Sequence, residues 1–324
     1  MNQQTTFIKK YKPYFIHDFT DDTNFLDIVN TLIQFKNLNI LFIGNINSGK
    51  TTLLDCIARQ YYNLKEDDNI PENNTLYINS LKEQGIQYFR NDMKTFCQSR
   101  SAIYGKKKLV LIDDIDSINE QSQQVFRNYI DKYSKNIHFI STCTNLQKVI
   151  ESLQSRLHII PIPKYSINYI EKSMKNIMKK ENMNLDKKVQ SFILNNSNGS
   201  VRKMINSIEK CFVFNNNVTL SNCEKLCSSI SFIHFDNYYK FLLKNDVKQA
   251  TKTLYDIYDY GYSVIDILDF LFYYTKKTEL LEENIKYEVI ILLCKYITIF
   301  HNVHEDCVEL ALITNNINKL FSSQ

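Results

Sequence analysis

The chain has 324 residues, of which 44% are hydrophobic, and it carries a formal net charge of +4 at pH 7. This length and composition allow a sizeable buried core and exceed what one compact domain needs, so we expect two or three domains. The small net charge excludes a polycation, and any nucleic-acid surface has to be a local concentration of basic residues.

Apolar runs and helical periodicities, taken in chain order, separate an α/β portion from two helical portions. Five short runs between polar turns are typical of β-strands: "NILFI", "TLYIN", "KLVLID", "IHFIST" and "HIIPI". Longer stretches with helical spacing lie between them, which predicts a parallel sheet covered by helices on both faces. After Pro163 the apolar residues recur three and four apart, with no strand-like run. We predict an α/β domain at residues 1–163, a small helical domain at 164–230 and a second helical domain at 231–324.

The segment after the first predicted strand reads "GNINSGKT", from Gly44 to Thr51, and fits the pattern G-x-x-x-x-G-K-S/T between a strand and a helix. Glycines let such a loop curl so that backbone N–H groups and the helix N-terminus surround phosphates. We expect Lys50 to neutralise the β- and γ-phosphates and Thr51 to offer its hydroxyl to Mg²⁺. The alternative, an ordinary strand–turn–helix corner, does not explain a lysine and a hydroxyl after the second glycine.

The third predicted strand, in "LVLIDDID", ends in the carboxylates of Asp113 and Asp114. Asp113 is expected to hold Mg²⁺ through its water, and Asp114 to orient and polarise the attacking water. The alternative is an N-cap cluster for the next helix, which Asp116 and Ser117 can satisfy without catalysis. The position of the pair at a strand end beside a phosphate loop favours the catalytic interpretation.

The strand, the loop and "LIDDID" resemble those of an AAA+ ATPase, and further stretches between residues 10 and 272 resemble, in order, the small subunits of replication factor C, the clamp loader of eukaryotes and archaea. These stretches are "KYKP" from Lys10, "GIQYFRNDMKTFC" from Gly85, "VFRNYIDKYSKNIHFISTCTN" from Val125, "SLQSRL" from Ser152, "NGSVRKMIN" from Asn198 and "GYSVIDILDFLF" from Gly261. The resemblance implies an AAA+ P-loop domain, a helical lid and an all-α collar for the three predicted portions.

The resemblance also implies roles for single residues. The residues that it places around ATP are Tyr11, Lys12 and Pro13 near the adenine, and Gly44, Asn45, Ile46, Asn47, Ser48, Gly49, Lys50, Thr51 and Thr52 around the phosphates. Asn145 resembles the sensor 1 amide, Arg202 resembles sensor 2 in the lid, and Arg156 resembles an arginine finger presented to the neighbouring subunit. On sequence alone, the favoured interpretation of the two arginines is a solvated surface cation, and Asn145 could equally be a turn residue at a strand end.

The sequence departs from the family at a few of these positions. Asp114 stands where the family usually carries glutamate, which shortens the carboxylate arm by one methylene and predicts slow hydrolysis. Leu157 replaces a cysteine after the finger, where the charge of Arg156 is unaffected. Asn45 and Ile46 replace common prolines, which predicts a less rigid loop before nucleotide binds.

A basic stretch between residues 82 and 108 is the candidate for nucleic-acid contact. It holds seven basic and two acidic residues, a local formal charge of +5 that exceeds the charge of the whole chain. A helix over Ile86–Cys97 places Arg90 and Lys94 together on a polar face, where cations can follow a DNA backbone. The alternative is a solvated helix face, and for residues 106–108 a basic hairpin without nucleic-acid contact is the favoured interpretation.

The leading hypothesis is therefore a small subunit of a clamp loader that binds ATP and Mg²⁺ and loads a ring clamp onto primer-template DNA. The implied partners are other loader subunits in a hetero-oligomer, a pentamer by resemblance. The alternatives are a structural subunit with little turnover, which Asp114 keeps open, and another AAA+ DNA motor. The segment at residues 1–13 has no apolar h-region, and Lys295 interrupts the most apolar later run. We expect a soluble intracellular protein without membrane association, in the nucleus or a cytoplasmic replication compartment.

Overall fold

The structure is a computed structural model, and it describes residues 5–66, 68–79, 93–197, 199–214, 218–227, 230, 232–300 and 303–322. Its contacts divide the chain into two compact units, Met1–Leu220 and Ser221–Gln324. The domain boundaries expected at residues 163 and 230 stay predictions. None of the described helices is both long enough and apolar enough to span a bilayer.

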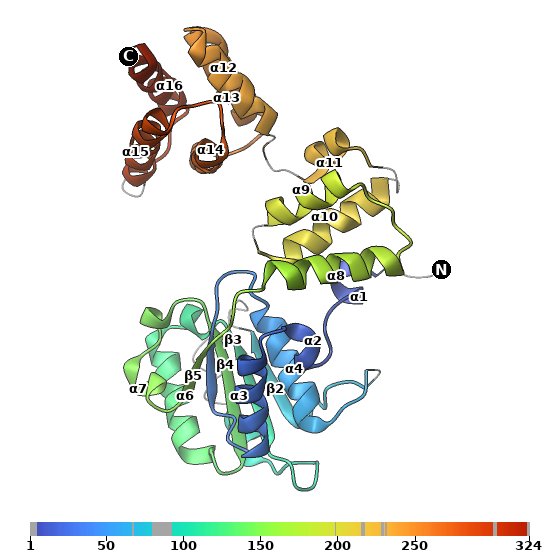
Figure 1. The fold of residues 1–324 in the computed structure, drawn as a ribbon. Helices are drawn as coiled ribbons and strands as arrows, with labels where there is room; N and C mark the ends of the chain where they lie inside the picture. The colour runs from blue at the N-terminus through green and yellow to red at the C-terminus, as the bar shows by residue number, and fades with distance from the viewer. Residues whose placement is uncertain are drawn as a thin grey trace. The chain divides into compact units, whose positions relative to one another are not determined.

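The first unit is built on a five-stranded parallel sheet, with the strand order β2-β3-β4-β1-β5 (Figure 1). The strands coincide with the five predicted runs: β1 Ile40–Ile43, β2 Thr75–Asn79, β3 Lys108–Asp113, β4 Ile137–Cys143 and β5 His158–Pro161. Because the strands are parallel, the residues that follow β1, β3 and β4 leave the sheet at the same edge. β4 lies between β3 and β1, so the segment after β4 emerges between the other two.

Helices cover both faces of this sheet, as predicted. Successive strand residues point to opposite faces. Ile40 and Phe42 therefore pack with α3 (Thr23–Gln34) and α4 (Lys50–Tyr62) on one face. Leu41 packs on the other face, with α6 (Glu120–Tyr133) and α7 (Glu151–Gln154). Burial on both faces explains why the strands appear in the sequence as continuous apolar runs.

Short helices and the lid complete the first unit. Their bounds are α1 Phe7–Lys10, α2 Ile16–Phe19, η1 Ile115–Ser117, η2 Leu146–Lys148, α8 Ile167–Lys180, α9 Lys187–Ser197 and α10 Val201–Phe214. The lid begins at α8 because the Ser166 side chain accepts a hydrogen bond from the Tyr169 backbone N–H. The backbone N–H of Phe7 donates to Glu209 Oε1 of α10 at 3.1 Å, which joins the N-terminal segment to the lid.

The second unit is entirely helical over its described residues, in agreement with the predicted collar. α11 (Leu220–Cys227) begins at the division between the units, and the further helices are α12 Phe232–Leu243, α13 Val247–Asp259, α14 Val264–Lys277, α15 Glu283–Ile299 and α16 Val308–Ser322. Tyr238 and Tyr239 are fully buried in its core. Their hydroxyls are hydrogen-bonded to Thr314 and Thr275, so the core buries large aromatic area without leaving these polar atoms unpaired.

Three consecutive lysines lie where β3 begins, at the amino edge of the sheet. Each donates from Nζ to a backbone carbonyl at the carboxyl end of a helix: Lys106 to Tyr61 of α4 (2.7 Å), Lys107 to Ser134 after α6 (3.2 Å) and Lys108 to Phe96 within the helical residues 93–98 (2.8 Å). The carboxyl end of a helix carries partial negative charge and unpaired carbonyls. These contacts give the triplet a structural role.

Candidate functional site

The phosphate loop connects β1 to α4 and depends on its two glycines. Gly49 is the N-cap of α4 and has φ +87°, in the left-handed region that favours glycine. A Cβ on Gly49 would lie 2.7 Å from both Phe19 Cε2 and Tyr165 Oη. A Cβ on Gly44 would lie 2.4 Å from Ser48 Oγ. The loop is therefore closed around these positions, and it leaves the backbone N–H groups of the α4 N-terminus without side-chain caps.

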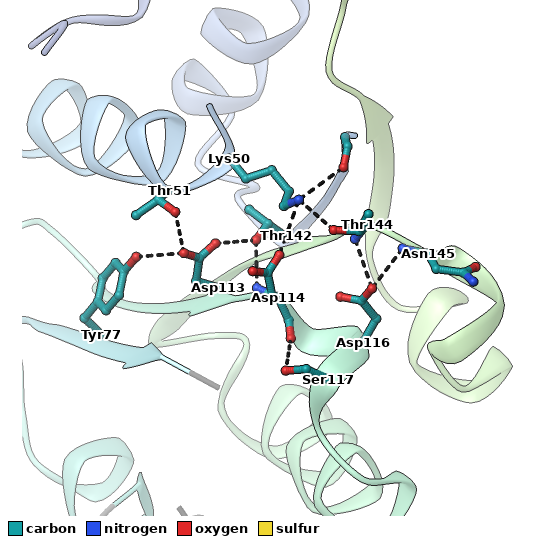
Figure 2. Close-up of polar contacts among 11 residues, drawn as sticks. Lys50, Thr51, Tyr77, Asp113, Asp114, Asp116, Ser117, Thr142, Thr144 and Asn145 are labelled. Carbon is teal, nitrogen blue, oxygen red and sulfur yellow. Dashed lines mark hydrogen bonds and ion pairs between the residues drawn. The ribbon is translucent and has the colours of Figure 1, made fainter. Parts of the chain in front are cut away.

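Lys50 is the first residue of α4, and its side chain is buried at the carboxyl edge of the sheet (Figure 2). Its Nζ donates to the carbonyl of Gly44 at 3.2 Å and to Thr144 Oγ1 at 2.6 Å. The same nitrogen lies 3.4 Å from Asp114 Oδ1, as an ion pair. The ammonium group thus lies where the segments after β1, β3 and β4 meet.

Asp113 is the last residue of β3, and each of its two carboxylate oxygens accepts hydrogen bonds from hydroxyl groups. Thr51 Oγ1 donates to Asp113 Oδ2 at 2.5 Å, and the Tyr77 hydroxyl donates to the same oxygen at 3.3 Å. Thr142 Oγ1 donates to Asp113 Oδ1 at 2.8 Å. Burial, reinforced by the charge of Asp113, raises the pKa of Tyr77, so its hydroxyl remains a donor. The pairing of Thr51 with Asp113 supplies the hard oxygen ligands that Mg²⁺ prefers.

Asp114 follows β3 in a left-handed conformation, with φ +52°. Its backbone N–H donates to Thr142 Oγ1 at 3.0 Å, and its side chain lies beside Lys50. Burial raises the pKa of Asp114, while the charge of Lys50 lowers it. A carboxylate with a raised pKa is a stronger base than an exposed aspartate, which suits a group that polarises water.

The turn after β4 is held by Asp116. Asp116 Oδ2 accepts from the backbone N–H of Thr144 at 3.1 Å and from that of Asn145 at 2.9 Å. The Asn145 side chain accepts from the Gln147 N–H at 2.9 Å and caps η2. Figure 2 shows Asn145 directed away from Lys50, because its amide is engaged in this local cap, and its predicted contact with the γ-phosphate stays a prediction. Thr144 contacts Lys50 instead.

The alternative interpretation of the acidic cluster as a helix cap does not describe this structure. The N-cap of α6 is Asn119, whose side chain accepts from the Ser122 N–H at 2.8 Å. Asp116 binds the turn after β4 instead, and Ser117 donates to the carbonyl of Asp114 at 2.8 Å. The acidic cluster therefore joins two segments at the sheet edge.

The residues present fit a bound nucleotide phosphate chain with Mg²⁺. Ser48 Oγ is buried and has no hydrogen-bond partner among the described residues, so the loop contains an unsatisfied donor that a phosphate oxygen would satisfy. Gly44 and Gly49 keep the loop free of side chains at its tightest points. Lys50 supplies the positive charge, and Thr51 with Asp113 would supply the metal ligands. Of the other predicted loop residues, Asn45 and Ile46 are exposed and Asn47 and Thr52 are half-buried.

The predicted adenine segment lies between α4 and the lid. Each of its residues has a partner in one of them: Tyr11 donates to Glu181 at the end of α8, Lys12 forms an ion pair with Asp55 of α4, and the carbonyl of Pro13 accepts from Cys56 Sγ at 3.3 Å. This attachment places the segment beside the helix that follows the phosphate loop.

The two predicted arginines lie on the surface. Arg156 Nε donates to Asp131 Oδ1 at 2.6 Å, and this hydrogen bond lowers the pKa of Asp131. Arg202 is exposed near the start of α10. Among the described residues, no hydrogen bond or ion pair links either arginine to Lys50 or to Asp114. The Arg156 side chain is half-buried, and its Nη1 also donates to the carbonyl of Ser152 at 2.6 Å. The roles of Arg156 toward another subunit and of Arg202 toward the nucleotide stay predictions.

The predicted DNA-binding helix is described only in part. Arg90 lies outside the described residues. Lys94 lies on the helical residues 93–98 and is exposed, while Met93 and Cys97 of the same stretch are buried. Met93 and Cys97 therefore lie on the buried side of this segment, and Lys94 is accessible to a partner.

Four residues of this site were missing from the sequence prediction: Tyr77, Asp116, Thr142 and Thr144. Thr144 directly follows β4, and Thr142 lies near its end, so polar residues at the end of a buried strand were an available signal. Asp116 was considered only as a cap. Tyr77, inside β2, had no motif to identify it.

Comparison with known proteins identifies related families on both units. Residues 40–165 match the ATPase family associated with various cellular activities, and residues 233–297 match the replication factor C C-terminal domain. The chain is 27% identical to replication factor C subunit 4 of Saccharomyces cerevisiae, over 90% of this chain and 88% of that protein. It is 25% identical to replication factor C subunit 3 of Schizosaccharomyces pombe, over 93% of this chain and 86% of the relative. It is also 25% identical to the replication factor C small subunit of Methanococcus vannielii, over 87% of this chain and 88% of that protein.

A solved structure supports the fold. The RuvB Holliday junction branch migration motor of Thermotoga maritima superposes with a TM-score of 0.52 at 12% sequence identity, covering 72% of this chain and 79% of that one. This likeness shows the AAA+ fold alone. The chain thus combines an AAA match in its first unit with a replication factor C C-terminal match in its second, and it is similar along most of its length to replication factor C subunits.

Proposed function

We propose that this protein is an ATP-hydrolysing subunit of a sliding-clamp loader, which helps to open a ring clamp and to place it on primer-template DNA. The observation that carries the proposal is the convergence of Lys50, Thr51 and Asp113 at the carboxyl edge of the sheet. A phosphate-binding cation, a hydroxyl and a carboxylate in this arrangement are the parts that phosphoryl transfer requires. The replication factor C match in the second unit favours a clamp loader over another AAA+ motor.

The chain's own residues divide the work at this site. Lys50 neutralises the terminal phosphates, and the loop N–H groups hold them in place. Thr51 and Asp113 are the residues that would hold Mg²⁺, which supplies charge neutralisation when bound. Asp114 accepts a hydrogen bond from the attacking water and orients it, with its pKa raised by burial.

The other proposed roles belong to the assembled hetero-oligomer, which we take to be a pentamer. Arg156 reaches the ATP of a neighbouring subunit, and Arg202 reaches the chain's own nucleotide when the lid closes. Lys94 and Arg90 follow the phosphate backbone of the duplex, which needs cations and no base-specific side chains. Tyr11, Lys12 and Pro13 border the adenine.

A structural subunit that holds ATP with little turnover is the second candidate. Asp114 favours it, because an aspartate reaches one methylene less far than the family's usual glutamate and here lies against Lys50. Turnover at this subunit's own pocket separates the two candidates.

Reconstitution with the partner subunits tests the proposal. The chain is expected to co-purify with related ATPases and a ring clamp from its native source, and the complex is expected to load clamp only with ATP. Lys50→Ala is expected to abolish tight ATP binding by this chain, measured by titration. Unchanged affinity would exclude this loop as the nucleotide site.

Arg156→Ala tests the assignment between subunits. In mixed complexes, the loss of turnover is expected in the neighbour's pocket, on the order of 10³-fold as for other arginine fingers supplied by a second chain. Arg127→Ala is the matched control, because Arg127 also pairs with Asp131. A loss confined to this chain's own pocket would contradict the role proposed for Arg156.

A further inference from the structure

Tyr77 brings a hydroxyl group from the edge strand β2 to the carboxylate that ends β3. In the register of these two parallel strands, Tyr77 pairs with Leu111, and Asn79 pairs with Asp113. Tyr77 therefore lies two residues before the partner of Asp113 and on the same face of the sheet, because strand residues alternate between faces. Its long side chain spans this diagonal, and its hydroxyl donates to Asp113 Oδ2 at 3.3 Å (Figure 2).

The Asp113 carboxylate is held by hydroxyl groups from three elements. Thr142 of β4 donates to Oδ1 at 2.8 Å, while Thr51 of α4 and Tyr77 both donate to Oδ2. Thr51 can bind a metal ion through an oxygen lone pair and still direct its proton at Asp113. An ionised carboxylate has about four acceptor positions, and the three hydroxyls occupy at least three of them. Held in this way, Asp113 cannot present both of its oxygens directly to a cation.

This restriction suits one divalent cation better than another. Mg²⁺ demands nearly octahedral coordination and keeps several of its waters, so it needs little of a carboxylate. Ca²⁺ takes roughly six to eight oxygen ligands and often binds both oxygens of one carboxylate. We propose that Tyr77 is a positioning residue that makes this site selective for Mg²⁺ over Ca²⁺, by occupying an acceptor position of Asp113 that binding through both oxygens would need. This inference rests on the nucleotide and Mg²⁺ site proposed above.

A tyrosine is well suited to this role because its donor is neutral and stiffly held. A lysine or arginine at the same place would neutralise the charge of Asp113, whereas Tyr77 leaves that charge for the metal. The aromatic ring has few rotatable bonds, so the hydroxyl keeps its direction along the strand. Asp113 itself is buried, with 7% of its surface exposed, so water competes little with these hydroxyls for its oxygens.

Tyr77→Phe tests the proposal, because it keeps the ring and removes the hydroxyl. Titration calorimetry on the full chain gives the affinity for ATP at saturating Mg²⁺ and at saturating Ca²⁺, and the ratio of the two affinities is the readout. Removing a hydrogen-bonded partner of a metal-binding carboxylate costs roughly 10–100-fold in metal affinity. The Tyr77 hydrogen bond is long and 37% of the residue is exposed, so we expect the ratio to fall by about tenfold, the lower end of this range.

Tyr255→Phe is the matched control. The Tyr255 hydroxyl on α13 donates to the carbonyl of Cys307 at 3.2 Å, so this variant removes a hydrogen bond of similar length within the second unit. It is expected to leave the ratio unchanged. Melting temperatures of both variants show whether either change acts through the stability of the fold.

A double variant shows whether Tyr77 acts through Asp113. Asp113→Asn removes the ionised carboxylate and is expected to lower the ratio on its own. Adding Tyr77→Phe should then change the ratio by less than about twofold, because residues that act as one unit are not additive. A further tenfold loss in the double variant would show that Tyr77 acts independently, and the positioning role would be overturned.

The remaining outcomes separate this inference from the proposed function. Equal losses of ATP affinity with Mg²⁺ and with Ca²⁺ would mean that Tyr77 contacts the nucleotide or supports the fold, and the proposal would be wrong. It would also be wrong if the unaltered chain bound ATP equally well with both cations. If the unaltered chain binds ATP with neither cation, the proposed function fails and the inference fails with it. If it prefers Mg²⁺ and Tyr77→Phe leaves that preference intact, the role of Tyr77 alone is refuted.

Discussion

Gly49→Ala is expected to destabilise the first unit because the new methyl group has no room. Its Cβ would lie 2.7 Å from Phe19 Cε2 and 2.7 Å from Tyr165 Oη. The Phe19 ring is buried, with 1% of its surface exposed, and the Tyr165 hydroxyl donates to the carbonyl of Ser48 at 3.2 Å. Neither neighbour can retreat without losing packing or a hydrogen bond. The alanine would also adopt φ +87°.

Two costs add at this position. A left-handed conformation costs a residue other than glycine about 1–2 kcal/mol, and forcing side chains apart in a packed region costs about 1–3 kcal/mol. The expected loss in the free energy of unfolding is therefore about 2–5 kcal/mol. For a unit of this size, each kcal/mol shifts Tm by about 2–4 °C, which predicts a fall of roughly 4–20 °C.

Gly105→Ala provides the matched control. Gly105 has φ +73°, but no atom lies within 4 Å of the position that its Cβ would occupy, so only the conformational cost of about 1–2 kcal/mol applies. Circular dichroism during urea unfolding measures both variants, since the chain has no tryptophan for fluorescence. The steric argument is refuted if the two variants lose the same stability. ATP affinity should fall for Gly49→Ala alone, because the displaced loop is the proposed phosphate site.

Three further predictions concern catalysis, DNA and pH. Asp114→Asn is expected to leave ATP bound but slow turnover in the assembled complex. Asp113→Asn should weaken the Mg²⁺ dependence and ATP binding together. Equal effects of the two variants would contradict separate roles for Asp113 and Asp114. Lys94→Glu is expected to weaken DNA binding by the complex for all sequences and to reduce its salt dependence, while Lys187→Glu on the lid should do neither; a loss limited to one sequence would exclude backbone contact. Burial, with a smaller contribution from a nearby lysine, lowers the pKa of His138 from 6.5 to about 3. Below pH 6.5 the unfolded chain therefore binds a proton at His138 that the folded chain does not, and the free energy of unfolding falls by about 2 kcal/mol between pH 6.5 and 5. His138→Asn should flatten this part of the dependence of stability on pH. An unchanged slope in the variant would refute the role of His138.

The sheet and the phosphate loop could be predicted because their signals are local. Strands buried on both faces appear as apolar runs, and glycine, lysine and threonine at fixed spacing define the loop. Asp113 was predictable for the same reason, since it ends an apolar run. The parallel arrangement then brings the loop and the carboxylates to one edge without further information from the sequence.

The choice between Thr144 and Asn145 could not be predicted, because two adjacent polar residues follow the same strand. Asparagine readily accepts a hydrogen bond from the backbone two residues later, and here that local cap holds the Asn145 side chain. Asp116 then fixes the turn from a different strand end. The Asp116 contact joins segments about 28 residues apart, which spacing alone does not reveal.

The lysine triplet at residues 106–108 has a consequence for any mutational scan of basic residues. Neutralising these lysines removes cations from three helix ends, so the folded fraction falls and every activity of the complex falls with it. Such variants would be false positives in a search for DNA contacts. The dependence of affinity on salt separates the two causes: a lost phosphate contact makes the dependence shallower, whereas a smaller folded fraction lowers the amount of active protein and leaves the slope unchanged.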